Sequence, residues 1–138
     1  MVGILIIAHG TFGESLIHSA THVLGVRPPR LLQLGISLQD DPQYVLPQAR
    51  ELVRQLDQGD GVLVLTDVYG ATPANIAAAL LIPGRVEGVA GASLPMLVRA
   101  LTYRNEHLDA VISKAVSGGV EGVFHMPPAS QSNAATGS

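Results

Sequence analysis

The apolar residues of this chain alternate between two patterns. Short, nearly unbroken apolar runs suit strands that are covered on both faces, as in a parallel sheet. Four such runs occur, at residues 2–7, 31–36, 62–66 and 86–92. Between the runs, apolar residues recur every three or four positions, which predicts amphipathic helices. We expect these helices over residues 14–24, 42–57 and 72–81, from residue 95 onward, and over residues 108–116.

Helix boundaries follow from capping residues and from proline. Asp40-Asp41-Pro42 offers two acids for a cation, but aspartate before proline is also a common helix start, which we prefer. Pro47 should perturb that helix near its beginning. Thr72 is a natural N-cap with Pro73 as the first helical residue, and Gly118-Gly119 should end the last helix.

Strands that alternate with helices predict an α/β fold with right-handed crossovers. We expect a small doubly wound sheet of four parallel strands in the order 2-1-3-4, flanked by helices. Residues 122–125 read as a short fifth strand. Residues 1–125 should form one domain, and residues 126–138 have no core-forming pattern and should be a disordered tail.

Composition narrows the possible partners and chemistry. Apolar residues make up 47% of the 138 residues and charged residues only 14%, so another subunit is expected to cover part of the surface. The net charge of −3 and the absence of Lys/Arg clusters argue against a nucleic-acid partner. The absence of cysteine excludes disulfides, a thiolate nucleophile and Cys-based zinc sites. No signal peptide precedes the first strand, which favours a cytosolic protein.

The candidate catalytic residues stand where two predicted strands end. His9 follows the first apolar run and Asp67 follows the third. In the order 2-1-3-4 these carboxyl ends lie side by side at the switch point where open α/β sheets bind ligands. A carboxylate that holds one ring nitrogen leaves the other as a nucleophile, able to attack phosphorus. The alternative is a purely structural hydrogen bond between the two residues.

A phosphoryl group on His9 would need hydrogen-bond donors for its oxygens. Candidate phosphate-binding residues lie in the two loops and at the following helix start: Gly10, Thr11, Gly70, Thr72 and Asn75. Neither loop holds a Lys or Arg, which suits a carrier that must release its phosphoryl group. No Walker or G-x-G-x-x-G sequence is present, so we expect no nucleotide, metal or other cofactor.

A second set of titratable residues lies on the first predicted helix. Glu14, His18 and His22 recur every four residues and so share one face. His-x-x-x-His on a helix can bind zinc, but the rest of a zinc motif is missing. We therefore interpret the three residues as a solvent-facing stripe.

Four segments in order resemble the enzyme IIA domain of the mannose-type (mannose, fructose, sorbose) sugar phosphotransferase system. The likeness runs from residue 2 to about residue 125. Its motifs are Ile7-Ala8-His9-Gly10, Leu65-Thr66-Asp67-Val68-Tyr69-Gly70-Ala71-Thr72-Pro73-Ala74-Asn75, Gly91-Ala92-Ser93-Leu94-Pro95-Met96-Leu97 and Gly118-Gly119-Val120-Glu121-Gly122-Val123. The resemblance implies that His9 accepts phosphate on Nε2 from the phosphocarrier HPr and passes it to an enzyme IIB component, while Asp67 holds Nδ1.

The resemblance also implies a homodimer in which a fifth, antiparallel strand is exchanged, here residues 119–125. In the family's aromatic-Gly-Gly-Ser/Thr-Pro loop this chain has Ala71 at the second glycine, which is acceptable unless position 71 needs a positive φ. The chain stops where well-known relatives continue into an enzyme IIB domain. We therefore expect a free-standing or regulatory enzyme IIA, in contact with the membrane only through a permease.

Other functions also fit parts of the sequence. Small tetrapyrrole metal chelatases begin with a similar Ala-His-Gly strand, in which case His9 would bind metal with His107 or His125. The phosphotransfer subunit for dihydroxyacetone kinase shares the histidine. A third alternative is an interaction module in which His9 is only a switch.

Overall fold

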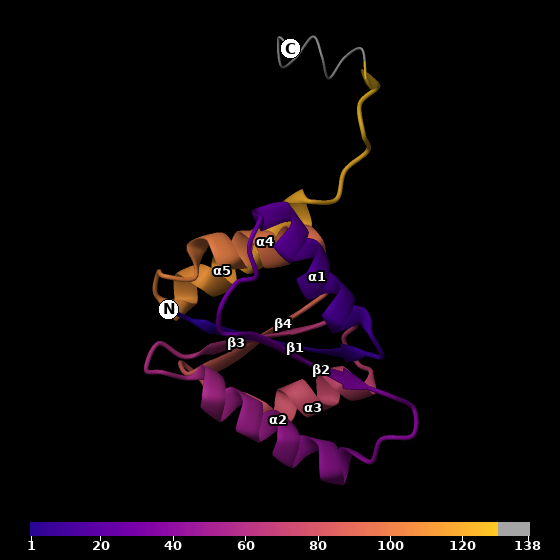
Figure 1. The fold of residues 1–138 in the computed structure, drawn as a ribbon, viewed down its shortest axis with the longest axis vertical. Helices are drawn as coiled ribbons and strands as arrows, with labels where there is room; N and C mark the ends of the chain where they lie inside the picture. The colour runs from indigo at the N-terminus through magenta and orange to yellow at the C-terminus, as the bar shows by residue number, and fades with distance from the viewer. Residues whose placement is uncertain (130–138) are drawn as a thin grey trace.

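Strands and helices alternate along the chain as far as the fourth helix, and a fifth helix follows directly. The computed structural model describes residues 1–129 (Figure 1), so most of the tail expected to be disordered, residues 130–138, lies outside the described part. The elements are β1 (Gly3–His9), α1 (Phe12–Leu24), β2 (Leu31–Ile36), α2 (Pro42–Leu56), β3 (Val62–Thr66), α3 (Thr72–Leu80), β4 (Val86–Ala90), α4 (Leu94–Tyr103) and α5 (Leu108–Glu121).

The four strands form one parallel sheet in the predicted order β2-β1-β3-β4. Ile7 of β1 lies opposite Thr66 of β3, and His9 lies opposite Ile36 of β2. The carboxyl ends of β2, β1 and β3 therefore meet at one edge of the sheet. The switch point expected between β1 and β3 is at that edge.

Helices cover both faces of the sheet and give three layers (Figure 1). Side chains of β1 alternate between the faces: Ile4 and Ile6 pack with α1, α4 and α5, whereas Leu5 and Ile7 pack with α2 and α3. All four of these side chains are completely buried. Burial on both faces explains why β1 is an unbroken apolar run.

Most of the predicted helix starts agree with the structure. Asp41 is the N-cap of α2, and its side chain accepts a hydrogen bond from the backbone N–H of Gln43, which confirms the cap interpretation. Pro47 lies inside α2, which continues through it to Leu56. One prediction was wrong by a residue: Ala71, not Thr72, is the N-cap of α3, so Thr72 is already helical. The φ of Ala71 is −96°, so alanine is acceptable there.

The C-terminal prediction needs a larger correction. Gly118 and Gly119 do not end α5, which continues to Glu121, and residues 122–125 of the described chain are not in a strand. The physical reason is close helix packing. A Cβ at Gly118 would lie 2.8 Å from the Cβ of Arg99, and one at Gly122 would lie 2.6 Å from the Cβ of Pro95. These glycines let α5 approach α4 rather than break the helix.

Buried arginine anchors the amino-terminal edge of the sheet. The side chain of Arg104, at the end of α4, is 4% exposed and donates to three backbone carbonyls: those of Val2, Pro29 and Arg30, at N···O distances from 2.6 to 3.1 Å. Burial lowers the pKa of Arg104 to about 10, which leaves it charged at neutral pH. The guanidinium thus ties β1 to the segment before β2.

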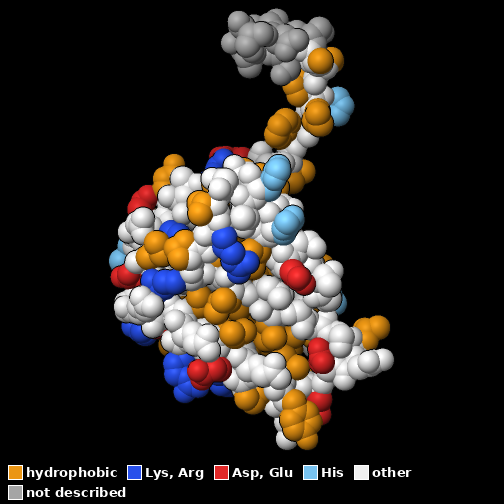
Figure 2. Space-filling model, viewed as in Figure 1, with side chains coloured by type: hydrophobic (Ala, Val, Ile, Leu, Met, Phe, Trp, Pro, Cys, Tyr) orange, Lys and Arg blue, Asp and Glu red, His pale blue; other side chains and the backbone are white. Residues whose placement is uncertain are grey.

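The outer face of α1 carries the predicted polar stripe. Glu14, His18 and His22 are all exposed, which confirms the solvent-facing interpretation. Figure 2 shows acidic and histidine side chains over α1 on this side of the molecule. Within residues 1–129, no helix combines the length and the apolar character needed to cross a bilayer.

Candidate functional site

The structure brings His9 and Asp67 into direct contact at the switch point. His9 is the last residue of β1, and Asp67 directly follows β3. The ring Nδ1 of His9 lies 2.8 Å from Oδ2 of Asp67, and the backbone N–H of His9 donates to the same oxygen at 3.0 Å. The His9 side chain is 50% exposed and that of Asp67 only 11%. One partly buried carboxylate oxygen therefore orients both the ring and the backbone of His9.

The electrostatics of Asp67 determine which nitrogen of His9 carries the proton. Burial by itself raises the pKa of Asp67, but hydrogen bonds from the His9 backbone, the His9 ring and the Val68 N–H outweigh it, and the pKa is lowered from 3.8. Asp67 is thus ionised at neutral pH and accepts a hydrogen bond from Nδ1–H, so the proton stays on Nδ1. In the neutral ring Nε2 then keeps its lone pair.

His9 also lines a small pocket of about 130 Å³ at the carboxyl edge of the sheet. The other lining residues come from the end of β2, the β2–α2 loop and the helix starts that follow: Ile36, Ser37, Leu38, Asp40, Pro42 and Thr72. None of these lining residues, all within the described chain, is a Lys or Arg. An anion placed here would meet the side chains of Ser37 and Thr72 and the positive ends of the α2 and α3 dipoles, and it would also face the acidic residue Asp40.

The candidate phosphate-binding residues do not all line this pocket. Thr72 does, as the first residue of α3. Gly10 directly follows His9 and has a φ of +53°, and Gly70 has a φ of +88° in the loop after β3. Thr11 is the N-cap of α1, but its side chain makes no capping hydrogen bond. Asn75 lines the neighbouring pocket between α2 and α3.

The sequence reasoning missed the β2–α2 loop as a wall of the site. Asp40 holds this loop, because its Oδ2 accepts a hydrogen bond of 2.7 Å from the backbone N–H of Ser37. The signal was available: β2 was predicted to lie beside β1, so the residues after Ile36 had to lie near His9. The segment carries no recognisable motif, and the sequence suggests for Asp40 only a helix start or, with Asp41, a cation site.

The fold and the site together define a class: doubly wound α/β proteins that present an oriented, half-exposed histidine at the switch point of the sheet. Residues 3–116 match the family model of the EIIA-man family, described as the PTS system fructose IIA component. This chain therefore belongs to the mannose-type enzyme IIA family of the sugar phosphotransferase system (PTS), whose members are phosphotransferase components.

Individual relatives agree with this assignment. The chain is 29% identical over 125 residues to the PTS mannose-specific EIIAB component of Escherichia coli K12, an alignment that covers 88% of this chain but only 38% of that protein. It is 28% identical over 109 residues to the PTS fructose-specific EIIA component of Bacillus subtilis 168, covering 78% of this chain and 73% of the relative. The chain thus spans well under half the length of the EIIAB component.

A solved structure shows the same fold. The crystal structure of the phosphotransferase system component EIIA from Streptococcus agalactiae superimposes with a TM-score of 0.80 at 26% identity. The match covers 91% of this chain and 97% of that one. The predicted α/β fold with four parallel strands and the predicted family are confirmed. The fifth strand expected over residues 119–125 is not, because residues 119–121 belong to α5 and residues 122–125 of the described chain are not in a strand.

The alternative functions gain no support. Among the side chains of residues 1–129, no cluster of three or more potential metal ligands is present. His107, a ligand candidate for a chelatase, is the N-cap of α5, and the adjacent Leu108 lies beside Gly61, which precedes β3. His107 is therefore near the amino-terminal edge of the sheet, opposite His9. The matches described above are all to PTS components.

Proposed function

We propose that this protein is a phosphoryl carrier of a sugar phosphotransferase system, with His9 as its phosphorylated residue. The observation that carries the proposal is the 2.8 Å contact between Nδ1 of His9 and Oδ2 of Asp67. In this contact Nδ1 is bound to a partly buried carboxylate, which leaves Nε2 as the nucleophile of a half-exposed ring. The family membership gives the reaction its class.

The proposed reaction is a reversible exchange of one bond for another. The lone pair of Nε2 attacks the phosphorus of a phosphohistidine on HPr, so a new N–P bond forms while the N–P bond of the donor breaks. The proton on Nδ1 stays in place, and the Asp67 carboxylate stabilises the positive charge of the phosphorylated ring. The same steps in reverse deliver the phosphoryl group to an enzyme IIB component.

The surroundings of His9 suit a carrier that releases its phosphoryl group better than a site that holds the group tightly. A guanidinium or ammonium would bind a phosphoryl group strongly, and the residues that line the His9 pocket include neither. Thr72 at the start of α3 supplies a hydroxyl group, and backbone N–H groups and helix dipoles supply weaker stabilisation. Gly10, Thr11, Gly70 and Asn75 are further candidates for contacts with the phosphoryl group or the docking partner.

The direct test is to incubate the protein with enzyme I, HPr and labelled phosphoenolpyruvate, so that the label can pass through enzyme I and HPr to this protein. The wild-type protein should be labelled, and His9→Ala should not. Asp67→Asn should fold and still be labelled, but about 10- to 100-fold more slowly, because the ring is no longer oriented by an ionised partner. Label that persists in His9→Ala would refute the carrier function.

A second outcome of the same assay concerns the phosphoryl acceptor. We propose an enzyme IIB component as acceptor, with a regulatory protein as the other candidate. Phosphorylated protein mixed with an enzyme IIB domain should lose its label to that domain within the assay. Retention of the label, with a regulatory partner bound only to the phosphorylated form, would favour signalling over transport.

We also propose that the protein is a homodimer. Strand β4 is an outermost strand of the sheet, and within residues 1–129 its outer side is paired only at Val86, which forms a bridge with Ile82. Beyond α5, the side chains of Val123, Phe124 and Met126 are 81%, 69% and 76% exposed. Figure 2 shows apolar side chains along this extending segment. A second copy offers both a strand edge and an apolar surface that this segment can cover.

A further inference from the structure

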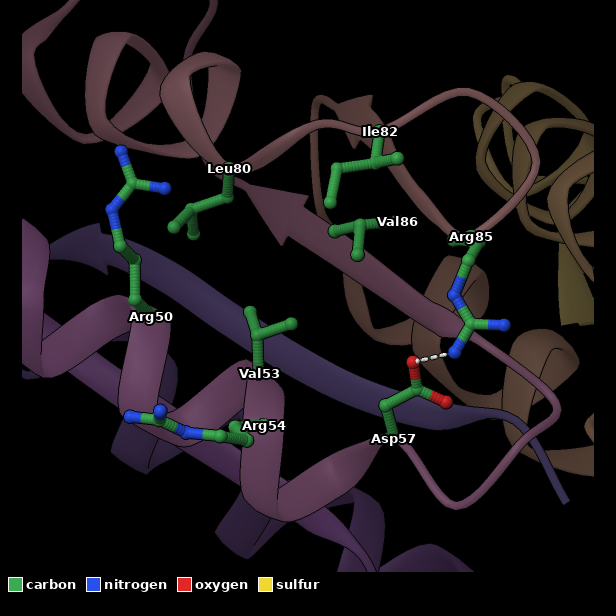
Figure 3. Close-up of a pocket in the computed structure, with 8 residues that line it drawn as sticks. All are labelled: Arg50, Val53, Arg54, Asp57, Leu80, Ile82, Arg85 and Val86. Atoms are coloured by element: carbon green, nitrogen blue, oxygen red, sulfur yellow. Dashed lines mark hydrogen bonds and ion pairs between the residues drawn. The ribbon is translucent and has the colours of Figure 1, made fainter.

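A further cavity, open to solvent, lies at the amino-terminal edge of the sheet, opposite His9. It has a volume of about 410 Å³ and is lined by the C-terminal half of α2, the end of α3 and the turn before β4. Figure 3 shows Val53, Leu80, Ile82 and Val86 forming its apolar wall. This size and lining are typical of small-molecule sites.

Three arginines line the same cavity: Arg50 and Arg54 from α2, and Arg85 from the turn before β4. They are three of the eight Lys and Arg residues of a chain whose net charge is −3. Two acids accompany them, since Arg54 pairs with Glu51 and Arg85 pairs with Asp57. One positive charge is therefore left over, on a molecule that is otherwise negative.

The three arginines differ in how many hydrogen bonds and ion pairs they make within the protein. Arg50 makes no side-chain hydrogen bond or ion pair with the rest of the described chain, and Figure 3 shows its guanidinium beside α3 at one end of the cavity. The pair of Arg54 with Glu51 is a surface pair, with side chains 75% and 50% exposed, and such pairs contribute little stability. The guanidinium groups of Arg50 and Arg54 can therefore bind a ligand in place of water without breaking a strong interaction within the protein.

Arg85 stands at the opposite end of the cavity in a fixed position. Asp57 binds its guanidinium and also accepts hydrogen bonds from the N–H groups of Gly59, at 2.9 Å, and Gly61, at 3.3 Å. The N–H of Gly59 contributes most to lowering the pKa of Asp57, so the carboxylate stays ionised and holds Arg85 in place. Arg85 keeps further N–H groups, and its side chain is 55% exposed.

From this arrangement we infer that the cavity binds a small organic anion, with its oxyanion group on Arg50 and Arg54 and an apolar body against Val53, Leu80 and Ile82. Guanidinium groups match the geometry of phosphate and carboxylate oxygens. The apolar wall disfavours a bare inorganic ion, because a bare ion would leave that wall in contact with water. The inference does not depend on the function proposed for His9.

The test is a titration of the ¹⁵N-labelled full-length protein, followed by backbone NMR, with phenyl phosphate, benzoate, phenol and inorganic phosphate. Phenyl phosphate or benzoate should give saturable shifts at Val53, Ile82 and Val86, and whichever of the two binds more tightly identifies the preferred oxyanion. Phenol lacks the charge and inorganic phosphate lacks the ring, so each should bind at least about fivefold more weakly.

Three substitutions sharpen the test. Arg50→Gln and Arg54→Gln should each weaken binding by about fivefold. Arg27→Gln removes the same charge from the segment between α1 and β2 and should leave the affinity unchanged. Shifts centred on His9 and Thr72, equal binding of phenol, equal binding of inorganic phosphate, or an Arg50→Gln affinity equal to wild type would each overturn the inference.

Discussion

At the scale of single residues, Asp67 is the side chain on which the geometry of the His9 site depends. Its Oδ2 accepts from the backbone N–H of His9 and from the ring Nδ1, while its Oδ1 accepts from the N–H of Val68. The carboxylate therefore joins the ends of β1 and β3 as well as orienting the imidazole. A change at Asp67 should affect stability and phosphoryl transfer together.

Asp67→Asn should lower the free energy of unfolding by about 1–2 kcal/mol at pH 5, because hydrogen bonds to an ionised carboxylate are lost. The pKa of Asp67 in the folded protein lies below its ordinary value of 3.8. Its contribution is therefore fully present above pH 3.8 and disappears as the pH falls through the lowered pKa. Urea denaturation of both proteins at several pH values measures this difference.

The matched control for that measurement is Glu106→Gln. Glu106 is exposed and its carboxylate makes no hydrogen bond or ion pair within residues 1–129. Its substitution should change stability by less than about 0.5 kcal/mol at every pH. A difference between wild type and Asp67→Asn that stays constant down to pH 2 would contradict the assigned hydrogen bonds.

Arg104→Met tests whether the buried Arg104 side chain stabilises the fold. Methionine fills similar space but leaves the carbonyl groups of Val2, Pro29 and Arg30 without their donor, so we expect a loss of about 3 kcal/mol in the free energy of unfolding. Arg54→Met, on the surface of α2, should cost less than about 0.5 kcal/mol. Equal effects in guanidinium chloride denaturation would show that Arg104 is not an anchor.

Residues of the site were predictable to different degrees. His9 and Asp67 each follow an apolar run, so the strand order alone placed them together. The arginines at the opposite edge were not predictable in this way, because Arg50 and Arg85 are far apart in sequence and only the folded chain brings them to one cavity. The role of Arg104 was missed for the same reason: its acceptors are backbone carbonyls, which leave no mark on the sequence.

At the scale of secondary-structure elements, the close contact between α4 and α5 depends on glycines of α5, which have no side chain. A Cβ at Gly118 would meet the Cβ of Arg99 at 2.8 Å and the carbonyl oxygen of Pro95 at 3.1 Å. A Cβ at Gly119 would instead meet the terminal methyl of Met96 at 2.8 Å. Backbone and Cβ atoms cannot move away cheaply, whereas a methionine tip can.

Gly118→Ala should therefore destabilise the protein by about 1–3 kcal/mol, although alanine is the better helix former. Gly119→Ala is its control one position along the same helix. It should be neutral or stabilising by up to about 1 kcal/mol, because helix propensity improves and Met96 can move aside. Thermal unfolding compares the two, and equal stability of both variants would contradict the packing described here.

The same contact explains where element prediction failed. The four strands and the first four helices were predicted from apolar runs and periodicity, with boundaries within a few residues. Gly118-Gly119 was interpreted as a helix end because glycine commonly ends helices. Whether a glycine ends a helix or admits a neighbouring one depends on what lies beside it, and that is tertiary information.

At the scale of the whole molecule, exposed apolar groups are unevenly placed. β4 is at one edge of the sheet, and the segment after α5 extends away from the body with Val123, Phe124 and Met126 exposed (Figures 1 and 2). A single copy leaves both features in contact with water. Association of two copies would remove them from water at once.

Deleting residues 123–138 should convert the proposed dimer into a monomer, as measured by light scattering across a range of concentrations. The cut falls after Gly122 because α5 reaches Glu121, and an earlier cut would remove part of its packing against α4. A chain that lacks only residues 130–138 is the control and should remain a dimer. A full-length chain that is monomeric at every concentration would refute the dimer.

The close approach of Gly122 to Pro95 has a consequence for how readily two copies could meet. A Cβ at position 122 would lie 2.6 Å from the Cβ of Pro95, so the chain leaves the domain from a point held against α4. A segment whose first residue is fixed against α4 samples fewer conformations than one that follows a frayed helix end, so less conformational entropy is lost when it docks on a second copy. A bulky residue at position 122 would release the segment from α4. It should therefore weaken dimerisation without contacting the partner.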